Sequence, residues 1–193
     1  LVGTIVYATG GKTSDAPLTT PDSIQLAALC RQMVDNGAEF MAIEASSHAL
    51  SQDRLAGIDF TAAAFTNLTG DHLDYHLTKE NYLAAKTKLF KELPAESTAV
   101  LNRQSPESNS IAKQTQANIL WYSIGGKADI VADIKDMRIG RTEYVLKYNG
   151  KSAKVFTELV GEHNISNQLA AAGLALAAGF DLETIAKGLS NLK

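Results

Sequence analysis

The sequence contains little of several features that would place it in a specialised class of protein. Its 193 residues include one cysteine, so no internal disulfide can form, and this fits a reducing cytosol. The net charge is −3 and no long lysine or arginine run occurs, so the sequence does not indicate the positively charged surface that binds nucleic acid. No apolar run approaches the ~20 residues of a membrane span, and the first residues lack the basic segment of a signal peptide. We therefore expect a cytoplasmic domain whose partners include neither a nucleic acid polymer nor a membrane.

What the sequence does contain is typical of a globular domain with a packed core. The hydrophobic fraction is 45% and the charged fraction 20%, and the length suffices for a sizeable core. Cys30 lies among apolar helix positions, which predicts a thiol in that core. The chain starts in strand-like residues and stops directly after a helical segment. We therefore expect residues 1–193 to be one domain of a larger protein.

Strand-like and helix-like segments alternate through the first two thirds of the chain. Buried strands are expected at residues 1–7, 40–43, 60–65, 98–101 and 119–124. Asp22 or Ser23 is placed to cap a first helix, which Asn36-Gly37 ends, and a polar loop is expected over residues 8–20. Further helices are expected at residues 78–93 and 106–116. This alternation predicts a three-layer α/β/α fold with a mostly parallel sheet.

The pattern changes after Gly125-Gly126. Apolar and polar residues alternate between residues 129 and 160, and Asn149-Gly150 is a tight-turn signal. We expect a small antiparallel β patch here, with strands at residues 129–139, 142–148 and 151–159. Helices are expected after it at residues 164–178 and 182–189.

Gly10-Gly11-Lys12-Thr13 is similar to part of a phosphate-binding loop. The usual spacing requires another glycine at position 6, where the sequence has Val6. Such a loop also leads into a helix whose N-terminus faces the phosphates, whereas Ser14-Asp15-Ala16-Pro17 is typical of more loop. We interpret this stretch as a loop without a phosphate-binding role.

Chargeable residues follow two of the expected strands, at the strand ends where α/β proteins bind ligands. Glu44 follows the strand at residues 40–43; a carboxylate there suits magnesium in a nucleotide enzyme, and a capping role is the alternative. The run Asp71-His72-Leu73-Asp74-Tyr75-His76 follows the strand at residues 60–65. His72 and His76 share a face if this run is helical, so a zinc hydrolase is one alternative and ordinary polar residues are another.

Three further stretches are ambiguous when each is taken by itself. Ser46-Ser47-His48 lacks the Gly-x-Ser-x-Gly elbow of a serine hydrolase. Lys86 lies in an apolar helical stretch, where the simplest interpretation is a stem along the helix with its amine in water. Asn164 and Asn167 share a face at the first turn of a helix, where they can contact an adenine edge or cap the helix.

Taken together, these stretches resemble the central domain of the Mur ligases, and most closely that of the UDP-N-acetylmuramoyl-tripeptide synthetases (MurE). The resemblance spans nearly the whole chain, and the shared motifs occur in one order along it. They are Thr19-Thr20, Glu44-Ala45-Ser46-Ser47-His48, Gln52-x-Arg54, Thr66-Asn67-Leu68 with Asp71-His72-Leu73-Asp74-Tyr75-His76, Ala84-Ala85-Lys86, and Gly161-x-His163-Asn164-x-x-Asn167.

The resemblance implies a fold of the P-loop type and a reaction. The family uses ATP and Mg²⁺ to join an amino acid to a nucleotide-linked peptide in peptidoglycan precursor synthesis, through an acyl phosphate. The closest subfamily implies UDP-MurNAc-L-Ala-D-Glu as the acceptor and meso-diaminopimelate or L-lysine as the amino acid.

The resemblance also implies roles for individual residues. Glu44 and His72 match magnesium ligands, and Lys86 matches a carbamylated lysine whose carbamate acts toward a second magnesium ion. The positions that match contacts to the UDP-MurNAc-dipeptide are Thr19, Thr20, Ser46, Gln52 and Arg54. The positions that match adenine-side contacts are His163, Asn164 and Asn167.

The sequence also departs from the family pattern. A Mur ligase carries a phosphate-binding loop, an N-terminal domain and a C-terminal domain that this sequence does not contain, so we expect the fragment by itself to be inactive. Leu18 precedes the threonine pair where many relatives carry asparagine. Three alternatives remain: folylpolyglutamate synthase or another Mur-type ligase, a zinc hydrolase using His72 and His76, and a non-catalytic Mur-like binding module.

Overall fold

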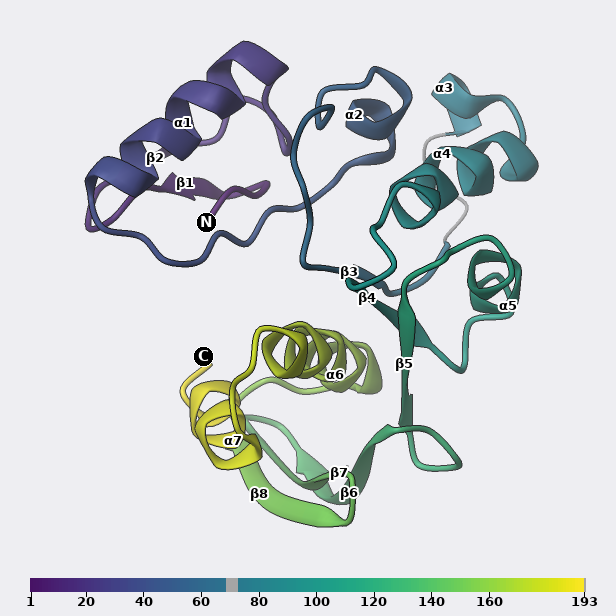
Figure 1. Ribbon diagram of the computed structural model, residues 1–193. Coiled ribbons are helices and arrows are strands. Elements are labelled where there is room, and N and C mark those ends of the chain that lie inside the picture. Colours follow the sequence, from purple (N-terminus) through teal and green to yellow (C-terminus); the bar gives the residue numbers. More distant parts are fainter. Residues whose placement is uncertain (69–72, 193) are drawn as a thin grey trace. The chain divides into compact units, whose positions relative to one another are not determined.

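The computed structural model describes residues 1–68 and 73–192, which divide into two compact units (Figure 1). Of the described residues, the first unit holds 1–58 and 73–88, and the second holds 59–68 and 89–192. Among these residues, no helix combines the length and the apolar character needed to cross a membrane.

The first unit begins with a two-stranded antiparallel hairpin. Strand β1 (Val6–Ala8) pairs with β2 (Thr13–Asp15), so the loop expected over residues 8–20 contains a short strand. The strand expected over residues 1–7 is wrong for residues 1–5, and only Val6 and Tyr7 of that range belong to β1. The strand expected at residues 40–43 is reduced to a single parallel bridge between Val2 and Ile43. The physical reason is that the chain bends at residues 3–5, so Val2 meets Tyr7 of β1 and Ile43 only through single bridges.

The Gly10-Gly11 pair forms the turn of this hairpin. Both glycines have positive φ, 71° and 88°, and the chain continues into β2 rather than into a helix. The turn lies against the end of α1, where the Asn36 side-chain amide donates to the Thr9 carbonyl at 2.6 Å. A Cβ at position 10 would come within 2.6 Å of Asn36 Cβ, so this approach requires glycine. The stretch is therefore a hairpin turn rather than a phosphate-binding loop.

Four helices follow in the first unit. α1 (Ser23–Asp35) is capped by Asp22, whose carboxylate accepts the backbone N–H of Gln25, as the capping prediction requires. α2 (Ser47–Ser51) and α3 (Leu73–His76) are short, and α4 (Lys79–Lys91) continues past Lys88 into the second unit.

The second unit contains a six-stranded sheet in the order β3-β4-β5-β6-β7-β8. The first four strands are parallel, and they are β3 (Ala62–Phe65), β4 (Thr98–Asn102), β5 (Asn118–Ile124) and β6 (Ile130–Arg138). The last two, β7 (Arg141–Tyr148) and β8 (Lys151–Thr157), pair antiparallel. The α/β prediction and the three antiparallel strands are confirmed. Because β6 also pairs with β5, these strands continue the parallel sheet.

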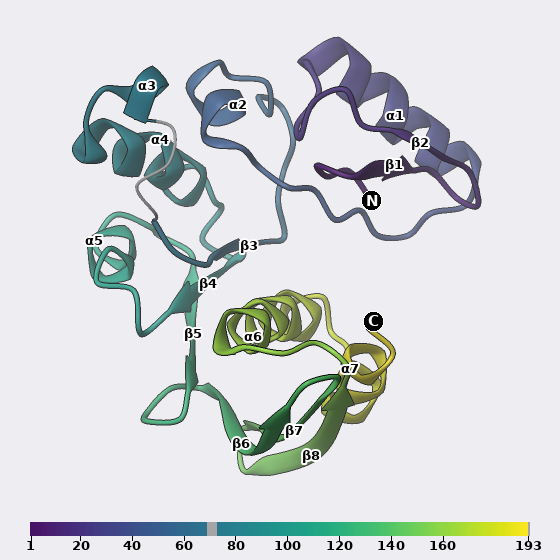
Figure 2. The same ribbon diagram turned by 180° about the vertical axis from the view of Figure 1, so that it is seen from behind.

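Helices cover both faces of this sheet, as Figures 1 and 2 show for β4 and β5, with α6 on one side and α5 on the other. α6 (Glu162–Ala177) packs closely on β4, since a Cβ at Gly173 would come within 2.4 Å of Val100 Cγ1. α7 (Leu182–Ser190) packs against β8. α5 (Ser108–Ala112) is shorter than the expected helix at 106–116, because the backbone N–H groups of Gln114 and Thr115 both bond to the Ile111 carbonyl and close a turn there.

Two tyrosines are buried in the core of this unit. Burial raises the pKa of Tyr122 to about 12, although a hydrogen bond with Ser166 opposes the shift. Burial also raises the pKa of Tyr144, whose hydroxyl donates to Gln168 Oε1 at 2.6 Å. The folded state therefore favours the neutral phenol at both positions.

We expect an alkaline titration of the six tyrosines to show a late phase from Tyr122 and Tyr144. Because the folded-state pKa of Tyr122 exceeds the ordinary value of 10.0, its contribution to stability is complete below pH 10.0 and is lost as the pH rises through about 12. Ultraviolet absorbance of the phenolate measures the titration, and Tyr122→Phe should reduce the late phase. An unchanged late phase in that variant would contradict the burial argument.

Candidate functional site

Glu44 and Lys86 lie close enough in the first unit for their charges to interact. Glu44 precedes α2 by three residues, and Lys86 lies within α4. Burial lowers the pKa of the Lys86 amine, and the Glu44 carboxylate opposes that shift. The fold therefore brings together two residues that are 42 positions apart in the sequence and were predicted to share a site.

The Glu44 carboxylate is oriented by Thr4. Its Oε2 atom accepts the Thr4 backbone N–H at 3.2 Å and the Thr4 hydroxyl at 2.7 Å. The Thr4 and Thr19 hydroxyl oxygens are 3.1 Å apart. Two donors from one residue on one carboxylate oxygen fix the direction in which the group points.

The Lys86 amine is placed against an aromatic ring rather than extended into water. Its Nζ atom lies 5.2 Å from the centre of the Tyr82 ring, one helical turn earlier in α4. Tyr82 is 4% exposed and Lys86 itself is partly buried. Because the pKa of Lys86 is lowered, a larger fraction of this amine is neutral and nucleophilic than in an exposed lysine.

Thr20 binds the backbone around Glu44 and is 1% exposed. Its hydroxyl donates to the Glu44 carbonyl at 2.6 Å and accepts the Ser46 backbone N–H at 3.0 Å. Ser46 in turn caps α2, where its hydroxyl accepts the Ala49 backbone N–H at 3.2 Å. Thr20 was predicted as a substrate contact, and in this structure its hydroxyl is engaged by the protein.

We expect Thr20→Val to destabilise the protein by roughly 1–3 kcal/mol, because the buried Thr20 hydroxyl loses two hydrogen bonds worth about 0.5–1.5 kcal/mol each, to the Glu44 carbonyl and from the Ser46 N–H. Thermal unfolding of the variant measures this loss. Thr19→Val is the matched control, since Thr19 is less buried and bonds to another hydroxyl. Equal and small effects of the two substitutions would show that Thr20 does not hold the Glu44 backbone.

Arg54 and Gln52 form a second polar group beside Thr20. Arg54 Nη1 donates to the Thr20 carbonyl at 2.9 Å, and its Nε and Nη2 atoms donate to Gln52 Oε1 at 3.0 and 2.6 Å. The Gln52 amide nitrogen then donates to the Tyr75 hydroxyl at 3.2 Å. The guanidinium is thus held in one orientation, which suits an Arg that reads a carboxylate or phosphate.

Two described histidines of this unit, His48 and His76, pack against tyrosine rings. His76 is 6% exposed and shares a hydrogen bond of 2.9 Å with the Ser47 hydroxyl. No group of three or more His, Cys, Asp or Glu side chains able to hold a metal occurs in residues 1–68 and 73–192. His72, the other half of the proposed zinc pair and a predicted magnesium ligand, lies outside the described residues.

The three predicted adenine-side residues lie at the start of α6 in the second unit. The Asn164 amide donates to the Val160 carbonyl at 2.8 Å. Asn167 is exposed one turn later. His163 packs on Gly161, where a Cβ would come within 2.7 Å of the imidazole. Gly161 has a φ of 99°, and no side chain caps this helix, whose Asn164 and Ile165 N–H groups bond to the Gly161 carbonyl at 3.1 and 3.3 Å.

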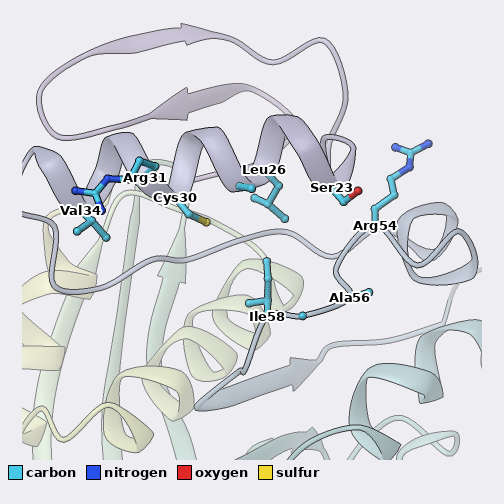
Figure 3. A pocket seen from close by; sticks show the side chains of 10 residues that line it. Ser23, Leu26, Cys30, Arg31, Val34, Arg54, Ala56 and Ile58 are labelled. Carbon is cyan, nitrogen blue, oxygen red and sulfur yellow. The ribbon is translucent and has the colours of Figure 1, made fainter.

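An open apolar hollow of about 410 Å³ lies in the first unit between α1 and residues 54–58 (Figure 3). Leu26, Cys30 and Val34 face Ile58 across it, while the Arg54 guanidinium extends away from them. Cys30 is partly exposed here, with its Sγ 3.6 Å from Met41 Sδ, so the predicted core thiol is wrong. The reason is that α1 fully buries only Leu26 and Met33. The lining offers no convergent polar groups for a reaction.

Sequence reasoning missed several residues that shape the site. Thr4 carried no local signal, because its partner Glu44 is 40 residues away. Tyr82 did carry one, namely its i, i+4 spacing from Lys86 on a helix.

Comparison with known proteins gives consistent matches. A family described as Mur ligase middle domain matches residues 1–175. A UDP-N-acetylmuramoyl-L-alanyl-D-glutamate–2,6-diaminopimelate ligase of Geobacillus kaustophilus is 44% identical over 100% of this chain and 41% of its own length. The like-named ligase of Parabacteroides distasonis is 37% identical over 100% of this chain and 39% of its own.

A solved structure of such a ligase matches 98% of this chain and 40% of its own, at 33% identity and a TM-score of 0.84. The chain thus spans about two fifths of the length of the curated relatives it matches.

Proposed function

This chain belongs to the Mur ligase family as a middle domain, and from that premise we propose that it is the central, nucleotide-using part of an amide-bond ligase. The parent enzyme joins a diamino acid, meso-diaminopimelate or L-lysine, to UDP-MurNAc-L-Ala-D-Glu at the expense of ATP, in the cytoplasm. The observation that carries this proposal is that the first unit fixes the Glu44 carboxylate through Thr4 and the Lys86 amine over the Tyr82 ring, at the positions that match the family's magnesium site.

The residues present fit magnesium if Lys86 is carbamylated. The Glu44 carboxylate is a hard oxygen ligand with one oxygen engaged by Thr4, which leaves the other for a cation. A neutral Lys86 amine adds to carbon dioxide and releases one proton, which converts a possible cation into a carboxylate-like group. Bound Mg²⁺ would neutralise the charge that develops as the γ-phosphoryl group moves. His72 is the third proposed ligand.

The reaction requires that the acceptor carboxylate be held and aligned. That carboxylate attacks the γ-phosphorus of ATP and releases ADP, and the amine of the amino acid then attacks the acyl carbon and releases phosphate. Arg54 is proposed to bind an anionic group of the nucleotide-linked peptide through the second N–H of Nη1 and of Nη2, while Gln52 and the Thr20 carbonyl hold the guanidinium in place. Thr19 and Ser46 are proposed as neighbouring contacts, and Thr20 as a contact through its backbone.

The second unit is proposed to contribute to ATP binding. No side chain caps α6, so its N-terminus is proposed to face the nucleotide. The exposed Asn167 amide and the neighbouring His163 and Asn164 are proposed to contact the adenine side.

The proposal is tested by the full-length parent with purified substrates. We expect phosphate release that requires ATP, UDP-MurNAc-L-Ala-D-Glu and a diamino acid together. Comparing meso-diaminopimelate with L-lysine identifies the amino acid. Activity with a folate and glutamate instead would favour the folylpolyglutamate synthase alternative, and no activity with either set would favour a binding module.

A further inference from the structure

A stack of buried rings connects α2 to the helix that carries Lys86. His76 shares its 2.9 Å hydrogen bond with Ser47, at the first turn of α2. On its other side the His76 imidazole stacks on the Tyr82 ring, with centroids 5.1 Å apart and planes inclined by 20°. The Lys86 amine lies 5.2 Å from the centre of that same Tyr82 ring. Contacts therefore run without interruption from Ser47 to Lys86.

The start of α4 is also fixed to His76 through the backbone. The Asn81 side-chain amide donates to the His76 carbonyl at 3.0 Å. Leu77 between the two helices has a φ of 67° and is 77% exposed, so it is held in a left-handed conformation that its own packing does not explain. The surrounding contacts hold the turn in this strained form, which sets the position of α4 relative to His76.

The other end of the stack leads to Glu44. Ser47 follows Glu44 by three residues, and Thr20 binds the intervening backbone at the Glu44 carbonyl and the Ser46 N–H. A series of contacts through Ser47, His76 and Tyr82 therefore connects the segment of Glu44 to the Lys86 amine.

We propose that His76 and Tyr82 are positioning residues, which hold the Lys86 amine at the distance from Glu44 that the reaction requires. Both side chains are buried, His76 at 6% and Tyr82 at 4% exposure, and they act through Lys86, since Tyr82 contacts its amine and His76 stacks on Tyr82. His76 thereby has a role other than metal ligation. This inference rests on the proposed function, because it concerns the lysine that the function uses.

The test uses the full-length parent with the variants Tyr82→Leu and Tyr82→Phe. Tyr82→Leu removes the ring below Lys86, and we expect kcat to fall about tenfold or more while each KM changes by less than about threefold. Tyr82→Phe keeps the ring, so its kcat should return to within about threefold of wild type. His76→Phe keeps the stack and loses the bond to Ser47, and we expect an intermediate kcat.

Phe90→Leu is the matched control. Phe90 also lies on α4, is 2% exposed and packs edge-on against Phe65, with ring centroids 6.3 Å apart. Its loss should lower the unfolding temperature as much as Tyr82→Leu does but leave kcat near that of wild type. A second readout is the ¹³C nuclear magnetic resonance signal of a lysine carbamate in ¹³C-bicarbonate, whose half-saturating bicarbonate concentration should rise in Tyr82→Leu.

The outcomes separate the two proposals. If the wild type is an active ligase and Tyr82→Leu matches Phe90→Leu in kcat and in the carbamate signal, the positioning role is wrong and the proposed function stands. If the wild type has no ligase activity, the proposed function fails and this inference fails with it. A selective loss of kcat with a weakened carbamate signal, rescued by Tyr82→Phe, supports the positioning role.

Discussion

Lys86→Ala in the full-length parent is expected to lower kcat on the order of a thousandfold, the scale of a lost electrostatic group in a preorganised site. Alanine cannot form a carbamate, so the negative group opposite Glu44 would be missing. Because a small carboxylate can enter the space that the side chain leaves, added acetate or formate should restore part of the rate. Initial rates of phosphate release, with and without the added carboxylate, measure both effects.

The control for this prediction is Lys88→Ala, two residues further along α4, where the amine pairs with Asp53. It should retain kcat, because Asp53 has no place in the proposed site. Full activity of Lys86→Ala would contradict the carbamate role, and so would a loss that no carboxylate relieves in a variant whose unfolding temperature is unchanged.

Arg54→Ala is expected to raise the KM for the nucleotide-linked peptide about 10–100-fold, with a smaller change in kcat. Arg54 is held by Gln52 and by the Thr20 carbonyl before any substrate arrives, so its fork meets an anion without further ordering. Arg54→Lys should recover only part of the affinity, because an ammonium keeps the charge but cannot form two parallel bonds. Steady-state kinetics with saturating ATP and amino acid give the two constants.

Arg31→Ala is the matched control for the arginine. Arg31 lies on the exposed side of α1 and pairs with Asp35 one turn away, so its removal should leave the same KM unchanged. If Arg54→Ala and Arg31→Ala are indistinguishable from wild type, Arg54 is not a substrate contact.

Local sequence signals located most of the fold. Asp22 and Asn36-Gly37 mark the two ends of α1 because capping uses side chains within a few residues of the helix. The alternation of apolar and polar residues around Asn149-Gly150 located β7 and β8, because this signal also lies within the segment itself. The strands expected at 1–7 and 40–43 failed because a strand is completed by distant partners that its own residues do not specify.

The site was predicted by motif resemblance more than by local chemistry. Local pattern favoured a solvated Lys86, whereas the fold partly buries the residue and places its amine over the Tyr82 ring. Thr20 was predicted to face substrate, and its hydroxyl bonds to a backbone segment 24 residues away. Neither contact is visible in the sequence, because both depend on how separate helices and loops pack. The proposed ligand His72 stays a prediction.

The central claim is that the parent of this chain forms an amide through an acyl phosphate, with Glu44 and Lys86 in the phosphoryl-transfer site. The most direct measurement labels the carboxylate that is joined, in UDP-MurNAc-L-Ala-D-Glu, with ¹⁸O and follows the label during turnover with ATP and diamino acid. The account predicts one ¹⁸O atom in the phosphate released, because that carboxylate oxygen leaves with the phosphoryl group. Amide product accompanied by unlabelled phosphate would contradict it.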